Sequence, residues 1–290
     1  MMRFLKFLPG VIIAGILFSS APAFANEENG LPGDKNFPSL ISNSSIQSPA
    51  YMQLCDSIYD KIGLLPYGLK REVFYKAYKG YQYLLSKKKL RKTNLLTICD
   101  YSQSSSSERL YVIDLKAGKL LYNTFVAHGK YSGEEFATSF SNLSSSNKSS
   151  LGFMITAETY SGKAGLSMRF DGVEKGINDQ VRNRDIVLHG SAFVSRSLMG
   201  TGPSISKSLG CPAVPFGIHK KIIENIKGGS CFFVNHSDMW YSRISTVLNA
   251  QFEIPELAKT LAVIKTETKT EGNSSAVNNR TSASPSLSTH

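Results

Sequence analysis

Apolar residues change their spacing along the chain near Arg91, and this change is the strongest constraint on the fold. Before that point they recur every three or four residues, as on one face of an amphipathic helix. The positions are Tyr51, Cys55, Ile58 and Ile62, and then Phe74, Ala77, Tyr78, Tyr81 and Leu85. Pro66 and Gly68 stand between the two groups and separate two helices. We therefore predict a helical segment over residues 49–92.

The chain after Arg91 consists of short apolar runs that alternate with Ser, Gly and Asn clusters. The runs are rich in β-branched, leucine and aromatic residues, which favour strands. They cover residues 94–101, 109–115, 120–127, 152–159, 185–188 and 230–235. Residues 114–119 suit a hairpin connection, and Ile222 and Ile226 share one face of a helix over 218–226. The predicted fold is mainly β, of the α+β class, with the helical segment in front of it.

The first 25 residues have the three parts of a cleaved signal peptide. A basic start with Arg3 and Lys6 leads into an apolar stretch over 7–18, and small residues end in Ala23-Phe24-Ala25. The apolar stretch is shorter than the roughly 18 to 20 residues that span a bilayer. No cysteine follows the cleavage point, so lipid attachment there is not predicted. We expect an exported protein, periplasmic or cell-wall associated, with no stable membrane anchor.

Composition sets the remaining boundaries. Residues 26–48 are rich in Asn, Ser, Gly and Pro and are predicted to be a linker. Residues 265–290 hold almost no large apolar side chain, so ordering them would cost more free energy than burial returns. We predict that they form a disordered tail. Residues 93–264 are then the main domain, which we predict to be catalytic.

The chain is basic, with a formal net charge of +11, or +9 without the two basic residues of the signal peptide. A positive surface outside a cell is attracted to anionic walls or lipid headgroups. The sequence has no stripe of basic residues with interleaved aromatics, which nucleic-acid binding would require. We predict no nucleic-acid partner, and we expect a monomer.

One cysteine and one histidine have the surroundings of a nucleophile and its base. His189 ends an apolar run, and the carbonyl group of Gly190 could hold its Nδ1–H, leaving Nε2 to face a thiol. Gly210 removes a side chain next to the sulfur of Cys211, so that a substrate carbonyl can approach. The backbone N–H groups of Leu209, Gly210 and Cys211 are candidates for an oxyanion hole. On these residues alone, a buried structural cysteine remains the alternative.

The other cysteines are Cys55, Cys99 and Cys231. Cys55 and Cys99 could form a disulfide between the helical segment and the first strand, or stay free, because sequence does not show their separation. Cys231 lies in an apolar run and is predicted to be a buried strand residue. No Cys-x-x-Cys pair occurs, so we predict no metal site, and we expect no cofactor.

A series of short motifs runs in order through about residues 50–240. They are His128-Gly129, Ser132-Gly133, Ala137, Phe140-Ser141-Asn142, Ser149-Ser150-Leu151-Gly152, Tyr160-Ser161-Gly162, Gly165-Leu166-Ser167, Asn178-Asp179, Arg184, and residues 186–190 and 208–214. Together they resemble the YkuD-like murein L,D-transpeptidase catalytic domain, in the branch whose cysteine motif ends in Gly-Cys-Pro-Ala. The resemblance implies a β-rich domain with the cysteine and the histidine in one groove.

For the site, the resemblance implies acyl transfer on peptidoglycan stem peptides. Cys211 would attack the carbonyl of the third stem residue and release the terminal D-alanine, while His189 would move the proton. An amine acceptor then makes the protein an L,D-transpeptidase, and water makes it an L,D-carboxypeptidase. Gly190 takes the place whose carbonyl orients the histidine, and Ser208 and Gly210 fill their motif positions.

Several matched positions stay open between function and structure. His128 also follows an apolar run, and it fits either a place in the groove wall or a structural role. The other substrate-binding or oxyanion candidates are Ser208, Leu209 and Gly210. Capping and charge pairing would equally explain a further group, Asn142, Asn178, Asp179 and Arg184. The remaining histidines, His219, His236 and His290, are predicted to be structural or solvated.

Two positions depart from the better-studied branch of the family. Leu209 stands where that branch usually has His or Asn, and Ala213 stands where it has Arg. The missing Arg affects how a substrate carboxylate would be held. Two other readings remain: a sortase-like cysteine transpeptidase, whose Thr-Leu-x-Thr-Cys strand the chain lacks, and a non-catalytic cell-wall-binding module with a degenerate site.

Overall fold

The structure is a computed structural model, and it describes residues 46–198 and 208–257. The predicted signal peptide, the predicted tail and all but the last three residues of the predicted linker lie outside the described residues. In the parts that are described, no helix combines the length and the apolar character that crossing a membrane requires.

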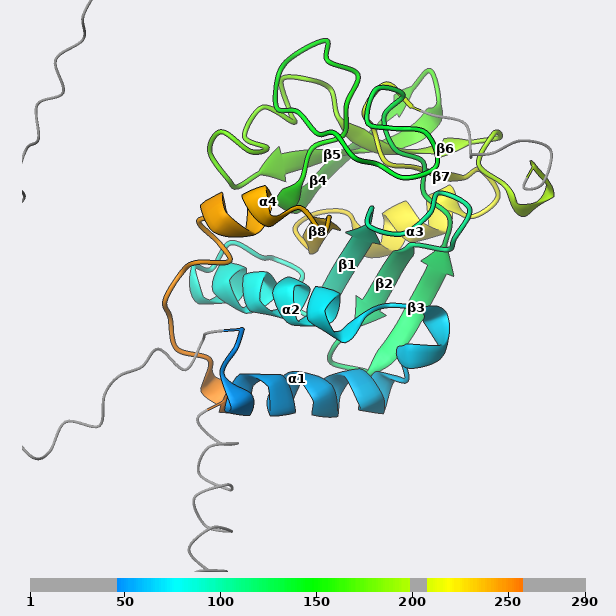
Figure 1. The fold of residues 1–290 in the computed structure, drawn as a ribbon. Coiled ribbons are helices and arrows are strands. Elements are labelled where there is room, and N and C mark those ends of the chain that lie inside the picture. The colour runs from blue at the N-terminus through cyan, green and yellow to red at the C-terminus, as the bar shows by residue number, and fades with distance from the viewer. Residues whose placement is uncertain (1–45, 199–207, 258–290) are drawn as a thin grey trace, which may run out of the picture. The chain divides into compact units, whose positions relative to one another are not determined.

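The helical front piece consists of α1 (Pro49–Ile62), a 3-10 turn (Leu65–Tyr67) and α2 (Arg71–Ser86), as predicted. Helix α1 packs against α2, and α2 packs against the strands β1 and β8 (Figure 1). The guanidinium of Arg71 joins the two helices, because it donates to Asp56 at 2.7 Å and to Asp60 at 2.6 Å. These helices therefore cover part of one face of the sheet.

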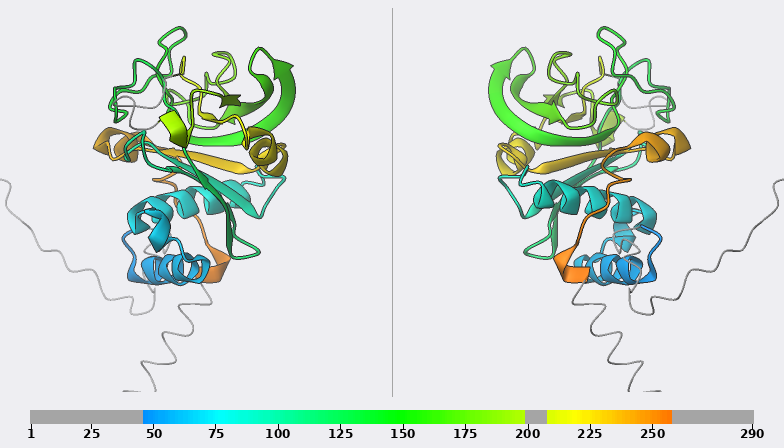
Figure 2. Two further views of the ribbon diagram at one scale, coloured as in Figure 1. Left: turned by 90° about the vertical axis from the view of Figure 1, so that its right-hand side faces the viewer. Right: turned by 90° about the vertical axis from the view of Figure 1, so that its left-hand side faces the viewer.

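The described residues form one eight-stranded mixed sheet in the order β3-β2-β1-β8-β4-β5-β6-β7. Its strands are β1 (Leu95–Asp100), β2 (Leu110–Asp114), β3 (Lys119–Thr124), β4 (Gly152–Gly162), β5 (Gly165–Gly172), β6 (Val187–Ser191), β7 (Ala213–Pro215) and β8 (Cys231–Asn235). Only the β1–β8 and β6–β7 pairs are parallel. Figure 2 shows a strongly curved green ribbon, which is the β4–β5 part of the sheet, at the end away from α1, while the last described residues, in orange, return to the side of α1. The prediction of a mainly β domain behind a helical piece is confirmed.

Two strands, one α-helix and a short 3-10 turn (Arg196–Leu198) were absent from the prediction. Strand β5 has alternating Leu166, Met168 and Phe170, but it contains no β-branched residue and lies between glycines. Strand β7 is three residues long and exists through its pairing with β6. Helix α4 (Met239–Ile244) spans six residues, too few for a helical period to show, and begins where Asp238 accepts from the N–H of Trp240. The predicted hairpin between β2 and β3 and the helix α3 (His219–Ile226) are confirmed.

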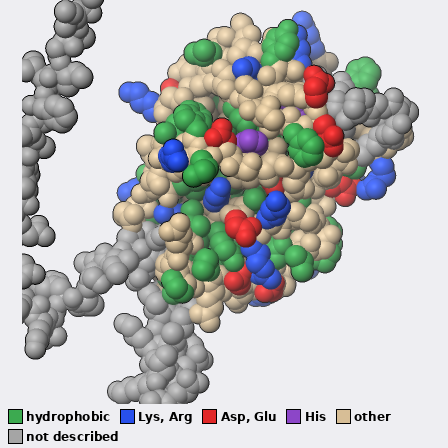
Figure 3. Space-filling view, viewed as in Figure 1, with side chains coloured by type: hydrophobic (Ala, Val, Ile, Leu, Met, Phe, Trp, Pro, Cys, Tyr) green, Lys and Arg blue, Asp and Glu red, His purple; other side chains and the backbone are tan. Residues whose placement is uncertain are grey.

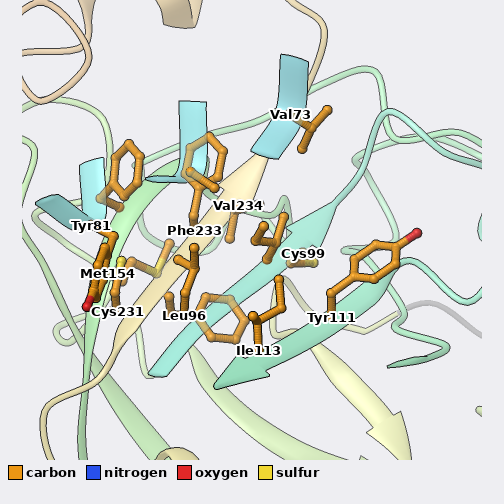
Figure 4. Packing of buried hydrophobic residues seen from close by; sticks show 14 of the residues in the cluster. Val73, Tyr81, Leu96, Cys99, Tyr111, Ile113, Met154, Cys231, Phe233 and Val234 are labelled. Atoms are coloured by element: carbon orange, nitrogen blue, oxygen red, sulfur yellow. The ribbon is translucent and has the colours of Figure 1, made fainter. Parts of the chain in front are cut away.

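The core joins α2 to the sheet. Figure 4 shows Val73 and Tyr81 of α2 over Leu96 of β1 and Phe233 of β8, and all four are buried. Residues from both sides of the predicted boundary at 92/93 belong to this one cluster. The front piece and the sheet therefore share a core.

The suggested disulfide between Cys55 and Cys99 is not formed, because both are free thiols. Cys55 lies on α1 and Cys99 on β1, whereas it is α2 that packs against β1. Each thiol contacts a tyrosine instead: Cys55 contacts Tyr51, and Cys99 contacts Tyr101. Burial raises the pKa of both thiols to about 12. Cys231 lies buried on β8, as predicted.

Candidate active site

The β6–β7 edge of the sheet brings the predicted histidine and cysteine together. His189 lies inside β6, which continues to Ser191, and pairs with Ala213 of β7. Cys211 comes two residues before Ala213. The sequence placed His189 at the end of its strand, so the strand runs further than predicted. A pocket of about 410 Å³ opens here, and it is lined by His189, Ser191, Phe193, Ser208, Leu209, Cys211 and Ala213.

The imidazole of His189 is held by the residue that follows it. Its Nδ1 lies 3.0 Å from the carbonyl oxygen of Gly190. A carbonyl oxygen only accepts hydrogen bonds, so Nδ1 carries the proton and Nε2 has a free lone pair. A half-buried histidine in this state can take a proton from a group in the pocket.

The thiol of Cys211 rests on the backbone that leads into β6. Its Sγ accepts from the N–H of Val187 at 3.5 Å and donates to the carbonyl oxygen of Asp185 at 3.6 Å. In the described parts of the chain no hydrogen bond joins Sγ to His189, although both residues line the pocket. Burial raises the pKa of the Cys211 thiol, and the Val187 N–H and the charge of Arg184 oppose this effect.

A tight turn precedes the cysteine. The hydroxyl of Ser208 accepts from the N–H of Gly210 at 3.1 Å and donates to the carbonyl oxygen of Cys211 at 2.6 Å. The N–H of Gly210, a predicted oxyanion-hole donor, is thus already occupied. The N–H groups of Leu209 and Cys211 have no acceptor in the described part of the chain and stay candidates.

Gly210 is required for a reason that differs from the one the sequence suggested. Its φ is +117°, a backbone conformation that residues other than glycine rarely adopt. A Cβ here would lie 2.8 Å from the carbonyl oxygen of Lys148. The glycine therefore lets the turn pack against residue 148.

His128 is not placed in the pocket wall, contrary to one of its two predicted roles. Its ring is buried, its Nδ1 lies 2.8 Å from Nη2 of Arg109, and its Nε2 lies 3.2 Å from the carbonyl oxygen of Gly133. Arginine only donates, so Nδ1 accepts and Nε2–H donates. The backbone of His128 supports the site, because its carbonyl accepts from the N–H of Ser208 at 2.9 Å.

The other matched polar residues lie outside the pocket. Asn178 is buried and donates to the carbonyl groups of Leu151 and Phe153. Asn142 donates to Asp179 at 2.8 Å. These three residues fasten loops around β4, which agrees with the capping role that the sequence left open.

The fold brings to the pocket Phe193 and Ser191, which sequence reasoning missed, and also the side chain of Leu209, whose N–H the sequence had proposed for the oxyanion hole. Phe193 and Leu209 are each 66% exposed and form an apolar part of the pocket lining. His219 is buried behind Gly190, where a Cβ on Gly190 would lie 2.6 Å from its ring. Its Nδ1 lies 2.6 Å from the carbonyl oxygen of Phe216. The alternation of inward and outward residues along β6 would have indicated Ser191, two positions after His189.

Charges on the surface are mixed. Figure 3 shows Lys and Arg side chains interspersed with Asp and Glu on the face it presents, with no continuous basic stripe there. The seven residues that line the pocket include no Lys, Arg, Asp or Glu. Among the described residues, the pocket thus offers a thiol, an imidazole, a hydroxyl pair and apolar surface, which suits acyl transfer better than binding of a highly charged ligand.

Comparison with known proteins identifies a family. The family model described as an L,D-transpeptidase catalytic domain matches residues 66–235, which is more than half of the chain and includes the pocket. The resemblance seen in the motifs is therefore confirmed. A search of curated proteins finds no match.

Solved structures with a distant likeness include two that are named L,D-transpeptidases and one that is named a cell shape determining protein. An L,D-transpeptidase from Mycobacterium smegmatis shares 12% identity at a TM-score of 0.30, over 49% of this chain and 59% of its own. One from Stackebrandtia nassauensis shares 15% identity at 0.30, over 66% and 80%. The helical cell shape determining protein Pgp2 from Campylobacter jejuni shares 13% at 0.32, over 56% and 57%. The chain thus spans less than two thirds of the first of these relatives.

Proposed function

The chain belongs to the family of L,D-transpeptidase catalytic domains, and on that premise we propose that it is an exported cysteine acyltransferase acting on peptidoglycan stem peptides. In this proposal Cys211 is the nucleophile and His189 is the general base. The observation that supports it most is that Cys211 and His189 line the same pocket, with the Gly190 carbonyl at Nδ1 of the histidine.

The reaction has two halves. The sulfur of Cys211 forms a bond to the carbonyl carbon of the stem residue before the terminal D-alanine, and His189 accepts the thiol proton on Nε2. The carbon–nitrogen bond then breaks, and the imidazolium gives the proton to the leaving amine. An amine or a water molecule attacks the thioester, loses a proton to His189, and releases the acyl group while the thiol is restored.

The N–H groups of Leu209 and Cys211 are the proposed donors to the oxyanion in both halves. Removing one preorganised donor from an oxyanion hole costs about 2.7–4 kcal/mol where a side chain supplies it. Ser208 contributes by fixing the turn that carries both groups, since its hydroxyl contacts Gly210 and Cys211. We do not assign the His128 ring a substrate contact, because its two nitrogens face Arg109 and Gly133.

Location is part of the proposal. The predicted signal peptide over residues 1–25 supports export, and the family name points to the cell wall as the place of action. The sortase-like alternative has no comparable support. A non-catalytic wall-binding module is the alternative that the experiment must exclude.

The test is to incubate the purified protein with tetrapeptide muropeptides and follow the products by mass spectrometry. We expect loss of terminal D-alanine, with crosslinked dimers if an amine is the acceptor and tripeptides if water is. A thioester should be trapped on residue 211, and Cys211→Ala should show none of these products. Equal behaviour of the wild type and Cys211→Ala would exclude the catalytic proposal. Muropeptide binding without turnover in both would favour the wall-binding alternative.

A further inference from the structure

Arg184 holds the segment that lies beneath the cysteine turn. Its Nη1 donates to the carbonyl oxygen of Ser141 and to the hydroxyl of Ser150, both at 2.6 Å. Its Nη2 donates to the carbonyl oxygen of Lys148 at 2.8 Å and to the hydroxyl of Ser146 at 3.1 Å. All four acceptors belong to one loop, so a single guanidinium fixes residues 141–150.

The 141–150 loop packs against the turn that carries Cys211. The carbonyl oxygen of Lys148 comes so close to Gly210 that a Cβ on this glycine would lie 2.8 Å from it. The hydroxyl of Ser149 also donates to the carbonyl oxygen of Gly210 at 3.4 Å. Arg184 therefore influences the position of the cysteine indirectly, because it holds the loop whose residues Lys148 and Ser149 contact Gly210.

Among the described residues, no acidic side chain forms an ion pair with Arg184. Its four acceptors are carbonyl and hydroxyl groups, and no ion pair involves it in the described residues. Its Nε is buried and has no hydrogen-bond partner. Arginine stays protonated under all ordinary conditions, so a full positive charge persists in this half-buried place.

The thiol of Cys211 is within electrostatic reach of this charge. Its two hydrogen-bond partners are backbone groups of Asp185 and Val187, which stand one and three positions after Arg184 in the chain. Three other ionisable groups lie near the thiol. The Asp185 carboxylate is exposed and paired with Arg169 at 2.8 Å, Nζ of Lys148 donates to Ser139, and His189 faces the same pocket.

We propose that Arg184 is a positioning residue of the active site: its guanidinium fixes the 141–150 loop under the Gly210–Cys211 turn and supplies the unpaired positive charge that stabilises the Cys211 thiolate. The catalytic part of this role rests on the function proposed above, whereas the effect on the thiolate does not. Burial raises the pKa of Cys211, and the Asp185 charge raises it further, whereas the Val187 N–H and then the Arg184 charge lower it. The arginine thus offsets part of the cost of ionising a thiol that is only partly exposed.

The experiment measures the rate of Cys211 alkylation by iodoacetamide against pH, using the intact protein and mass spectrometry of the modified peptide. Arg184→Gln removes the charge, and Arg184→Lys keeps the charge but loses the fork of donors. Arg182→Gln is the matched control, because Arg182 lies two residues away and its charge is already paired with Glu158 and Asp171.

We expect Arg184→Gln to move the alkylation midpoint to higher pH and to slow alkylation at pH 7 about tenfold, as one pKa unit would. Arg184→Lys should keep the midpoint near that of the wild type while its melting temperature falls, and Arg182→Gln should keep the midpoint. An unchanged midpoint in folded Arg184→Gln would overturn the proposal. If Arg184→Gln does not fold, a midpoint in Arg184→Lys that moves well above the wild type would overturn it. Alkylation needs only the thiol, so this result stands apart from the muropeptide test.

Discussion

Nδ1 of His189 lies 3.0 Å from the carbonyl oxygen of Gly190, so the residue after the histidine fixes its ring. A backbone carbonyl cannot be lost by mutating a side chain, and it carries no charge to change with pH. The orientation of the ring therefore depends on where the β6 backbone lies. The packing of His219 against Gly190 becomes part of the same arrangement.

His189→Gln should lose most of the D-alanine release and stay folded. Glutamine has no proton-accepting nitrogen, and a positioned general base contributes about 10²–10⁴-fold. The histidine is only half-buried, so the melting temperature should change little. Steady-state release of D-alanine and thermal unfolding measure the two effects. An active His189→Gln protein would remove the histidine from the mechanism.

Gly190→Ala should destabilise the protein by about 1–3 kcal/mol, as overpacking does. The new methyl would lie 2.6 Å from Cγ of His219. Gly190→Ala combined with His219→Ala should cost less than the sum of the two single changes, because the second change removes the clash. Denaturant unfolding of the four proteins gives the coupling. Strict additivity would mean that the two residues do not press on each other.

Gly210→Ala should cost about 1–3 kcal/mol of stability and most of the activity. The cost comes from a φ of +117° and from the approach of the Lys148 carbonyl, which is backbone and cannot rotate away. Gly217→Ala is the matched control, since a Cβ there would meet nothing within 4 Å and its φ is not in the left-handed region. Chemical unfolding and D-alanine release compare the two. Equal behaviour of both variants would contradict the requirement for glycine at 210.

The sequence could predict the pair Cys211 and His189 because the motifs around both residues are local and follow in order, and the fold places both residues in the lining of one pocket. The hydrogen bonds that hold the thiol of Cys211 could not be predicted from the sequence. The N–H of Val187 and the carbonyl of Asp185 are backbone groups found in every residue, and only the approach of two distant segments gives them a role. The same holds for Arg184, whose four acceptors on one loop become visible only in the fold.

The sequence predicted the strands that are rich in buried apolar side chains. It missed strands that form mainly because a neighbouring strand pairs with them. Strands β1, β2 and β8 are buried and rich in apolar residues, so composition found them. Strand β7 is three residues long and forms because β6 lies next to it. His128 matched the motif but turned inward to Arg109, since nothing in its neighbouring residues shows a partner 19 positions away.

Thiol titration should find one reactive cysteine in the native protein and four after denaturation. Cys55, Cys99 and Cys231 are fully buried, and burial raises the pKa of the first two to about 12. Cys211 alone is partly exposed and opens to the pocket. Reaction with a thiol-specific disulfide reagent, before and after guanidinium, counts them. Only two thiols in the denatured, unreduced protein would show that Cys55 and Cys99 are joined after all.

Glu174 should make the stability of the protein fall as pH rises above the usual range of a glutamate. Its carboxyl group is buried, accepts from the N–H of Phe153 at 2.8 Å and the hydroxyl of Tyr241 at 3.0 Å, and contacts the hydroxyl of Ser245. Burial raises its pKa despite these donors. The folded state therefore binds the proton more tightly than the unfolded state. This contribution is complete below the unfolded pKa and is lost as pH rises through the folded one.

Glu174→Gln should remove that pH dependence, because an amide does not ionise. Between pH 4 and pH 7 the free energy of unfolding of the wild type should fall relative to that of Glu174→Gln. Glu224→Gln is the control, since Glu224 lies at the surface beside Lys227 and should leave the slope unchanged. Urea unfolding at a series of pH values measures the slope. If instead the free energy of unfolding of the wild type rises with pH relative to that of Glu174→Gln, the prediction is wrong. The hydrogen-bond donors to Glu174 would then outweigh the effect of burial and keep its carboxylate, which lies between β4 and α4, ionised.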